Sequence, residues 1–106
     1  MVKLKRIQNK NTILQLLSKS SIYRGKKYRI HFKKGEEDFS YAISVSKHLG
    51  NAVKRNREKR WVRSIFYKYR FDINSGANVF IIIKQAGGLY TEAENEIFGF
   101  IKENFK

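Results

Sequence analysis

Two neighbouring segments decide the fold: Phe39-Ser-Tyr-Ala-Ile-Ser-Val45 and Asn51-Ala-Val-Lys-Arg-Asn-Arg-Glu-Lys-Arg60. The first alternates between apolar and polar residues, which is typical of a half-buried strand. After Gly50 the apolar residues recur at helical spacing, which predicts a long basic helix from about Ala52 to about Tyr69. The chain therefore places a strand and a basic helix in direct succession.

The segment before this pair also favours strands. Residues 21–32 are rich in β-branched and aromatic side chains, and Tyr28-Arg-Ile-His-Phe32 alternates. Arg24-Gly25-Lys26 offers a break, so the segment supplies either one strand or two. The polar residues 33–38 form a turn before the strand at Phe39. Strands joined by short turns predict a meander.

A continuous apolar run, Val79-Phe-Ile-Ile-Ile83, follows the basic helix. Runs of this kind are found in strands that are buried on both faces. We therefore predict that this strand is central in the sheet and that Ile82 belongs to the core.

Both ends of the chain show helical patterns. Asn11 and Thr12 can cap a short first helix, and Thr91-Glu-Ala-Glu94 fits a capping box for a last helix. The apolar positions of these helices are Ile13, Leu14, Leu16 and Leu17, and then Ala93, Ile97, Phe98, Ile101 and Phe105. The resulting order, α-β-β-β-α-β-α, predicts one domain over residues 1–106 of the α+β class, folded as a two-layer α/β sandwich.

The composition points to a polyanionic partner. The 106 residues include 23 Lys and Arg against 9 Asp and Glu, a formal net charge of +14. Nucleic acid, an anionic membrane or an acidic protein could bind a chain with this excess of positive charge. A membrane is disfavoured because the helices need their apolar faces for the core. No apolar run reaches the ~20 residues that span a bilayer, so we expect a cytoplasmic protein.

Catalytic chemistry by the chain itself is not indicated. Cysteine is absent, which excludes a disulfide, a thiol nucleophile and a cysteine zinc site. His31 and His48 are the only histidines, and Glu36-Glu-Asp38 lies in one turn without an acid–base partner. We predict no catalytic residue and no metal ligand.

A helical wheel divides the basic helix into two sides. The core side carries Val62, Ile65, Phe66 and Tyr69, and the opposite column carries Asn56, Arg60, Arg63 and Tyr67. Arg55 and Arg57 fall on opposite flanks of that column. Glu58 falls on the core side, where a carboxylate needs a partner, and Lys54, one turn earlier, is the expected one.

The cations on this helix have the chemistry of phosphate recognition. Arginine presents a planar fork, lysine a point charge, and Asn56 can donate and accept at a sugar or base edge. Trp61 beside the column either stacks on RNA or packs against the helix flank. The alternative to binding is a solvated charged face. The candidate RNA-binding residues are Lys47, Asn51, Lys54, Arg55, Asn56, Arg57, Lys59, Arg60 and Arg63.

The run from Ser44 to Arg60, followed by Arg63, resembles the signature of the bacterial ribonuclease P protein component. Gly-Asn-Ala-Val, Arg-Asn-Arg and the Lys-Arg pair all stand at the family's spacing. The resemblance extends more weakly from about Leu4 to the end of the chain. It implies a subunit of an endoribonuclease that binds a catalytic RNA and helps to remove the 5′ leader from precursor tRNA. The catalytic centre is then in the RNA, with Mg²⁺ held mainly by RNA phosphates.

The resemblance also implies roles for particular residues. Its Arg-Asn-Arg helix faces the catalytic RNA, which carries over to Arg55, Asn56, Arg57, Lys59, Arg60 and Arg63. Its cleft for the single-stranded leader carries over to Ile13, Leu17, His31 and Lys84. Between the third strand and the next it implies a left-handed crossover, against the general preference.

The chain departs from this family at two places. Ile13 and Leu17 stand where aromatic residues are common, and aliphatic side chains stack poorly on bases. Glu58 stands where an apolar residue is usual, which puts the depth of helix burial in question.

A non-catalytic RNA-binding protein of the ribosomal or RNA-chaperone type is the alternative function, because its charge and fold would look similar.

Overall fold

The computed structural model describes residues 4–105. Its elements in chain order are β1 (Leu4–Arg6), α1 (Lys10–Ser18), β2 (Ser21–Arg24), β3 (Tyr28–Glu36), β4 (Phe39–Val45), η1 (Lys47–Leu49), α2 (Ala52–Lys68), η2 (Arg70–Asp72), β5 (Gly76–Ile83) and α3 (Tyr90–Phe105). The α+β class is confirmed, and α2 matches its predicted bounds to within one residue. The segment before β4 supplies two strands, β2 and β3. The predicted order lacks only β1, whose three residues are too few to show a period.

The strands form one mixed sheet in the order β1-β4-β5-β3-β2. The central position of β5 is confirmed, whereas the predicted meander is wrong because β5 lies between β3 and β4. It runs antiparallel to β3 and parallel to β4. Alternation along a strand shows which face is buried but not which strand is its neighbour. A parallel pair needs a long crossover connection, and α2 supplies it. The left hand of this crossover stays a prediction.

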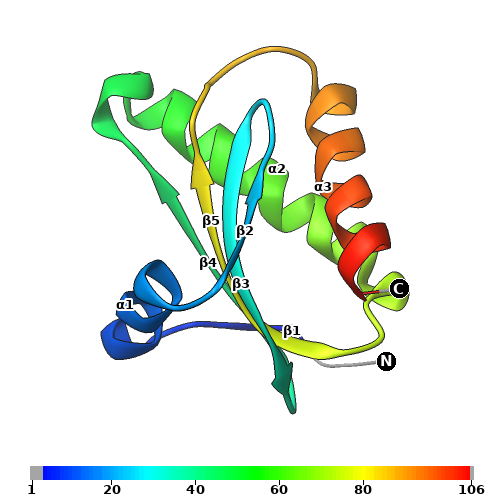
Figure 1. The fold of residues 1–106 in the computed structure, drawn as a ribbon. Helices are drawn as coiled ribbons and strands as arrows, with labels where there is room; N and C mark the ends of the chain where they lie inside the picture. Colours follow the sequence, from blue (N-terminus) through cyan, green and yellow to red (C-terminus); the bar gives the residue numbers. More distant parts are fainter. Residues whose placement is uncertain (1–3, 106) are drawn as a thin grey trace.

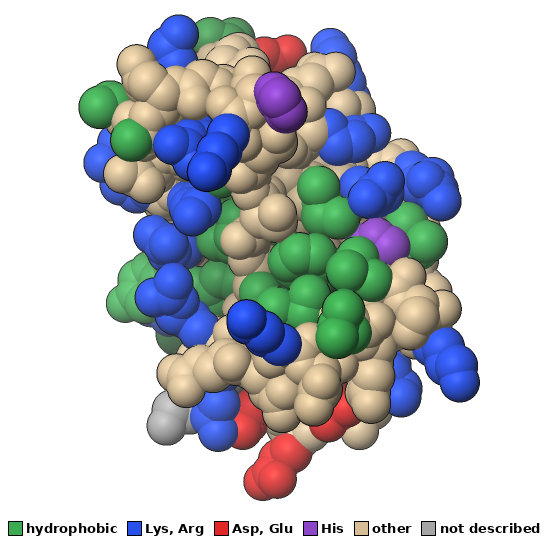
Figure 2. Space-filling model, turned by 90° about the vertical axis from the view of Figure 1, so that its left-hand side faces the viewer, with side chains coloured by type: hydrophobic (Ala, Val, Ile, Leu, Met, Phe, Trp, Pro, Cys, Tyr) green, Lys and Arg blue, Asp and Glu red, His purple; other side chains and the backbone are tan. Residues whose placement is uncertain are grey.

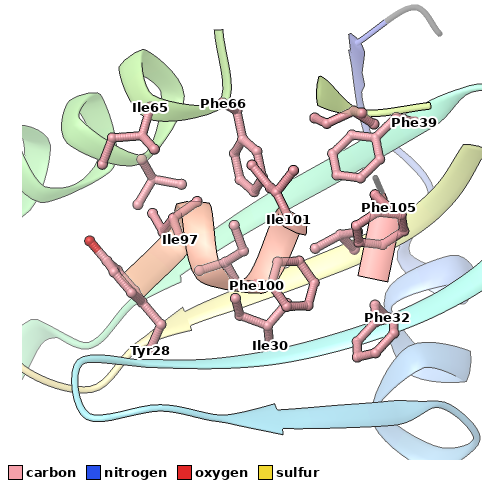
Figure 3. Close-up of a cluster of buried hydrophobic side chains, with 14 of the residues drawn as sticks. Tyr28, Ile30, Phe32, Phe39, Ile65, Phe66, Ile97, Phe100, Ile101 and Phe105 are labelled. Carbon is pink, nitrogen blue, oxygen red and sulfur yellow. The ribbon is translucent and has the colours of Figure 1, made fainter. Parts of the chain in front are cut away.

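The core lies between the sheet and the pair α2 and α3, which pack side by side on one sheet face (Figure 1). Phe100, Ile101 and Phe105 of α3 reach the same cluster as Ile65 and Phe66 of α2 and the alternate residues of β3 (Figure 3). The rings of Phe39 and Phe66 are 5.6 Å apart between centroids, and those of Phe32 and Phe100 are 5.2 Å apart. Helix α1 covers part of the opposite face, beside β3 and β5.

Partial cover by α1 explains how β5 differs from its prediction. Ala77, Val79, Ile81 and Ile83 are buried, whereas Ile82 on the other face is only half-buried. The expectation that β5 is buried on both faces is therefore wrong, and so is the assignment of Ile82 to the core. A continuous apolar run cannot distinguish a strand that is covered fully on both faces from a strand that is covered fully on one face and partly on the other.

Two predicted helix starts also fall too late. Asn9 caps α1 by accepting the Asn11 N–H at 2.8 Å, two residues before the predicted cap. Helix α3 begins at Tyr90, and the Glu92 carboxylate accepts the Leu89 N–H at 3.0 Å. The chain turns at Gly87 and Gly88, whose φ values of 85° and 77° suit glycine, and this turn places the helix start before Thr91. No helix within residues 4–105 is both long and apolar enough to cross a membrane.

We predict that Ile81→Ala lowers the free energy of unfolding by about 2–5 kcal/mol, because it leaves a cavity in the core. Ile82→Ala, on the half-buried face of the same strand, is its matched control and costs clearly less. Urea denaturation followed by circular dichroism measures both. Equal losses for the two variants would contradict the burial pattern of β5.

Candidate nucleic-acid interface

The start of α2 is fixed by a short capped loop. Ser46 accepts the His48 N–H at 3.2 Å, and Asn51 accepts the Lys54 N–H at 3.0 Å through its side-chain oxygen. Gly50 between them has a φ of 138°, and a Cβ there would lie 3.0 Å from Cδ of Lys54. The side-chain oxygen of Asn51 is thus used as the helix cap, which leaves its amide group for other contacts. Lys47, Asn51 and Lys54 are all exposed.

The rear side of α2 is anchored as the helical wheel predicts. Val62, Ile65 and Phe66 are fully buried in the core, whereas Tyr69 is half-buried and stacks on Phe98 with 4.4 Å between ring centroids. Asn56 and Arg60 are exposed on the outward side. Because the rear surface is fixed, the outward column has a single orientation relative to the sheet.

The candidate cations of α2 divide between two flanks. Lys59 and Arg63 lie beside β4, with Arg55 one turn before Lys59. Arg57 lies on the other flank, where its guanidinium carbon is 5.2 Å from the Trp61 ring centroid. The four side chains are half-buried. The contact with Trp61 thus fixes the flank of Arg57, whereas the flank of Arg55 stays a prediction from helical spacing.

A cationic cavity lies between α2 and the edge of the sheet. Its volume is about 180 Å³, and it is lined by Arg6, Tyr41, Lys59 and Arg63 together with apolar residues of β4 and of the segment after β1. Arg6 faces Tyr41 in the parallel pairing of β1 with β4. Burial raises the pKa of the Tyr41 phenol, although Arg63 and Arg6 oppose the shift, so the phenol stays neutral. Sequence reasoning missed Arg6, which only the short β1 brings beside β4, and Tyr41, whose strand β4 packs next to α2.

The opposite face of the sheet holds the residues predicted to form the leader cleft. Figure 2 shows an apolar area near the centre of this face, bordered on both sides by Lys and Arg side chains. Leu17 on α1 is exposed and Ile13 is half-buried. His31 on β3 pairs with Phe80 on β5, and Lys84 follows four residues later, about 13 Å along the strand. Lys84 donates to the Gly25 carbonyl at 2.6 Å. The structure thus brings α1 and His31 together and places Lys84 at the far end of the face.

His31 is much less accessible than the predicted cleft would require. It is 5% exposed and lies near the backbone of Leu16 on α1. Burial lowers the pKa of its imidazole, and the neighbouring Arg29 and Arg24 lower it further. His31 is therefore a neutral part of the floor under α1.

The partner of Glu58 is not the predicted one. Glu58 is fully buried, and its Oε1 lies 2.7 Å from Nζ of Lys27 in the β2–β3 turn. Its Oε2 accepts the Gly87 N–H at 2.9 Å, and the Lys27 ammonium donates to the Gly87 carbonyl at 2.7 Å. Lys54 instead packs near Gly50. The expectation that Lys54 pairs with Glu58 is therefore wrong, because a cation distant in sequence reaches the buried carboxylate.

The same ion pair settles the position of Trp61. Its ring lies 5.4 Å from the Lys27 ammonium and 5.5 Å from the Tyr90 ring, edge to face. Of the two alternatives for Trp61, stacking on RNA or packing against the helix flank, the structure shows the packing. Within residues 4–105 no group of three or more His, Asp or Glu side chains is placed to hold a metal ion.

A mixed sheet with one helix anchored at its rear and cationic at its front defines a class of small basic α+β proteins. A family model described as Ribonuclease P matches residues 1–102. The chain therefore belongs to the ribonuclease P protein family. This agrees with the resemblance carried by the segment from Ser44 to Arg63.

Individual relatives point the same way. The ribonuclease P protein component of Mesoplasma florum is 42% identical over 64 residues, 58% of each chain. That of Listeria innocua is 34% identical over 80 residues, 74% of this chain and 66% of the relative. The matches thus span about three fifths to two thirds of these relatives.

Solved structures share the fold. The RNase P protein from Thermotoga maritima superposes with a TM-score of 0.81 at 20% identity, covering 95% of this chain and 98% of that one. The RNase P protein of Staphylococcus aureus gives a TM-score of 0.76 at 25% identity, covering 92% and 93%.

We predict that Glu58→Gln lowers the free energy of unfolding by about 3–5 kcal/mol, because it leaves the Lys27 ammonium buried without a counter-charge. The double variant Lys27→Met/Glu58→Leu removes both charges and recovers most of this loss. Urea denaturation of Lys27→Met, of Glu58→Leu and of the double variant gives the coupling energy of the pair. A loss below about 1 kcal/mol for Glu58→Gln would show that the pair is not buried as described.

We predict that stability falls as the pH drops from about 7 to about 5 and that His31 contributes to this fall. The pKa of His31 is lowered in the folded state, so the unfolded chain binds more protons within this window. His31→Gln therefore flattens the dependence of the unfolding free energy on pH. Urea midpoints across the pH range measure the slope. An unchanged slope for His31→Gln would contradict a neutral, buried imidazole.

Proposed function

We propose that this chain is the protein subunit of ribonuclease P and binds the catalytic RNA through the outward side of α2. The observation that carries the proposal is the helix itself: a buried rear surface fixes a front that presents Asn56 and Arg60 to solvent. Exposed arginine side chains suit phosphate oxygens. Because the chain belongs to the ribonuclease P family, RNA is the polyanion that we propose for this surface. Lys47, Asn51 and Lys54 extend this surface at the helix start.

The flanks of α2 contribute differently to RNA binding in this proposal. Lys59 and Arg63, with Arg6, line a cavity large enough for a phosphate group, and the neutral Tyr41 phenol can hydrogen-bond there. Arg55 lies on this same flank, one turn before Lys59. The Arg57 guanidinium packs against the Trp61 ring, and its Nη2 lies 3.5 Å from Oε2 of Glu58. Arg57 is therefore an ordered cation at the other flank.

The 5′ leader of precursor tRNA would cross the face that carries α1. The apolar area of this face can pack against sugars and bases, and the bordering cations can meet phosphates (Figure 2). In this arrangement Leu17 and Ile13 form one wall, His31 contributes to the floor, and Lys84 meets a phosphate farther along. The wall binds by apolar contact rather than by aromatic stacking.

The chemistry of leader removal belongs to the RNA in this proposal, as the family resemblance implies. Mg²⁺ would be held mainly by RNA phosphates, and the described residues present no cluster that fits it. The protein binds and positions the two RNAs, and the cytoplasm, where these RNAs meet, is its proposed location.

Cleavage of precursor tRNA at low Mg²⁺ tests the proposal. Three mixtures are compared: the protein alone, the RNase P RNA of the same organism alone, and the two together. We expect cleavage to be fast only in the third mixture. If the protein bound both RNAs without accelerating cleavage, the alternative of a non-catalytic RNA-binding protein would be favoured. Cleavage by the protein alone would contradict an RNA catalytic centre.

We predict that Arg60→Ala weakens binding to the catalytic RNA and reduces the slope of log K against log salt by about 0.7–0.9, because one phosphate contact is lost. Arg60 is exposed and outside the core, so the melting temperature stays unchanged. Lys102→Ala, which removes an exposed charge from α3, is the matched control. Filter binding over a salt series measures the slopes. Equal slopes for the two variants would count against the outward side of α2.

A further inference from the structure

Three side chains form a separate cluster at the C-terminal end of α2. The guanidinium carbon of Arg70 lies 3.9 Å from the Tyr67 ring centroid and 4.5 Å from that of Phe71. Nη1 of Arg70 also donates to the Tyr67 carbonyl at 2.6 Å. We call these three residues the Tyr67–Arg70–Phe71 cluster. One guanidinium thus orders two aromatic rings.

The cluster is not part of the core. Tyr67 is 63% exposed and Phe71 is 65% exposed, and within residues 4–105 neither ring stacks on another aromatic ring. The neighbouring Tyr69 behaves differently, because it is half-buried and stacks on Phe98. Packing inside the protein therefore explains Tyr69 but does not explain two large, exposed rings held in place by an arginine.

The cluster continues the outward column of α2. Tyr67 lies one turn beyond Arg63, about 6 Å farther along the helix axis, on the side that carries Asn56 and Arg60. The segment that resembles the family signature ends at Arg63. A nucleic acid that follows the column would meet the cluster next.

We propose that the Tyr67–Arg70–Phe71 cluster binds an unpaired RNA base by stacking, with the adjacent phosphate at Arg70. The inference rests on the proposed function and extends it to a site beyond the signature. Aromatic rings next to arginine are the platform on which single-stranded nucleic acids stack. Arginine has five N–H donors and the structure uses one of them on Tyr67, so a phosphate can take others.

Charge favours RNA over a protein partner at this place. The chain carries a net charge of +14, and Arg60 and Arg63 precede the cluster along α2. An apolar protein surface that covered the rings would have to desolvate these cations, whereas a phosphate chain neutralises them. The proposed ligand is therefore a nucleotide of the catalytic RNA or of the precursor leader, and both sources offer the same chemistry.

A first experiment measures stacking directly. A labelled short oligouridylate and an abasic strand of the same length are titrated with the wild type, with Tyr67→Leu/Phe71→Leu and with Tyr67→Phe. The leucine variant is expected to bind the oligouridylate about five- to hundredfold more weakly while its affinity for the abasic strand changes little. Tyr67→Phe keeps the ring and is expected to bind as the wild type does. The salt slope of the leucine variant stays unchanged because no charge is removed.

A second experiment distinguishes the two sources. The same variants are titrated with the RNase P RNA, and precursor tRNA with and without its leader is then added to the preformed complex. If the leucine variant binds the RNase P RNA more weakly than the wild type does, the stacked base belongs to the catalytic RNA. If only its affinity for precursor tRNA with a leader is reduced, the base belongs to the leader. Wild-type affinity of the leucine variant at both steps would overturn the inference. If the wild type bound neither RNA, the proposed function would be wrong, and the oligouridylate comparison would still decide the stacking.

Discussion

The anchorage of α2 is the constraint on which the rest of the structure depends. Val62, Ile65 and Phe66 are fully buried among residues of α3 and the sheet, so the helix can neither rotate nor shift without opening the core. Because the rear surface is fixed, the residues of the outward column keep one orientation toward solvent. The crossover that carries α2 also sets β4 beside β5, which gives the sheet its central strand. Fold and interface thus depend on the same helix.

The buried Lys27–Glu58 pair adds a second connection to α2. It ties the β2–β3 turn and the segment around Gly87 to the helix. An apolar residue would avoid the desolvation of two charges, so the pair is not required for stability as such. Its structural effect is to hold Trp61 and Arg57 on one flank. The cations of that flank are ordered by packing as well as by charge.

The sequence predicts what depends on local period and composition. The bounds and the two sides of α2 follow from spacing within one element, the central β5 follows from its apolar run, and the α+β class follows from the order of the elements. Contacts between distant elements were not predictable. Nothing near Glu58 in the chain indicates Lys27, and nothing in the three residues of β1 indicates that Arg6 reaches Lys59 and Arg63. His31 was placed on the correct strand, but its burial depends on where α1 lies.

A tethered cleavage measurement tests the central claim most directly, because the chain contains no cysteine and a single one can be introduced. Val53→Cys lies at the outward start of α2, where the side chain is 77% exposed, and Lys102→Cys lies on exposed α3. Each carries an iron chelate that produces hydroxyl radicals near bound RNA. The account predicts strong, localised cuts in the catalytic RNA from position 53 and weak or no cuts from position 102. Equal cutting from both positions, or cutting from position 102 alone, would contradict an interface on the outward side of α2.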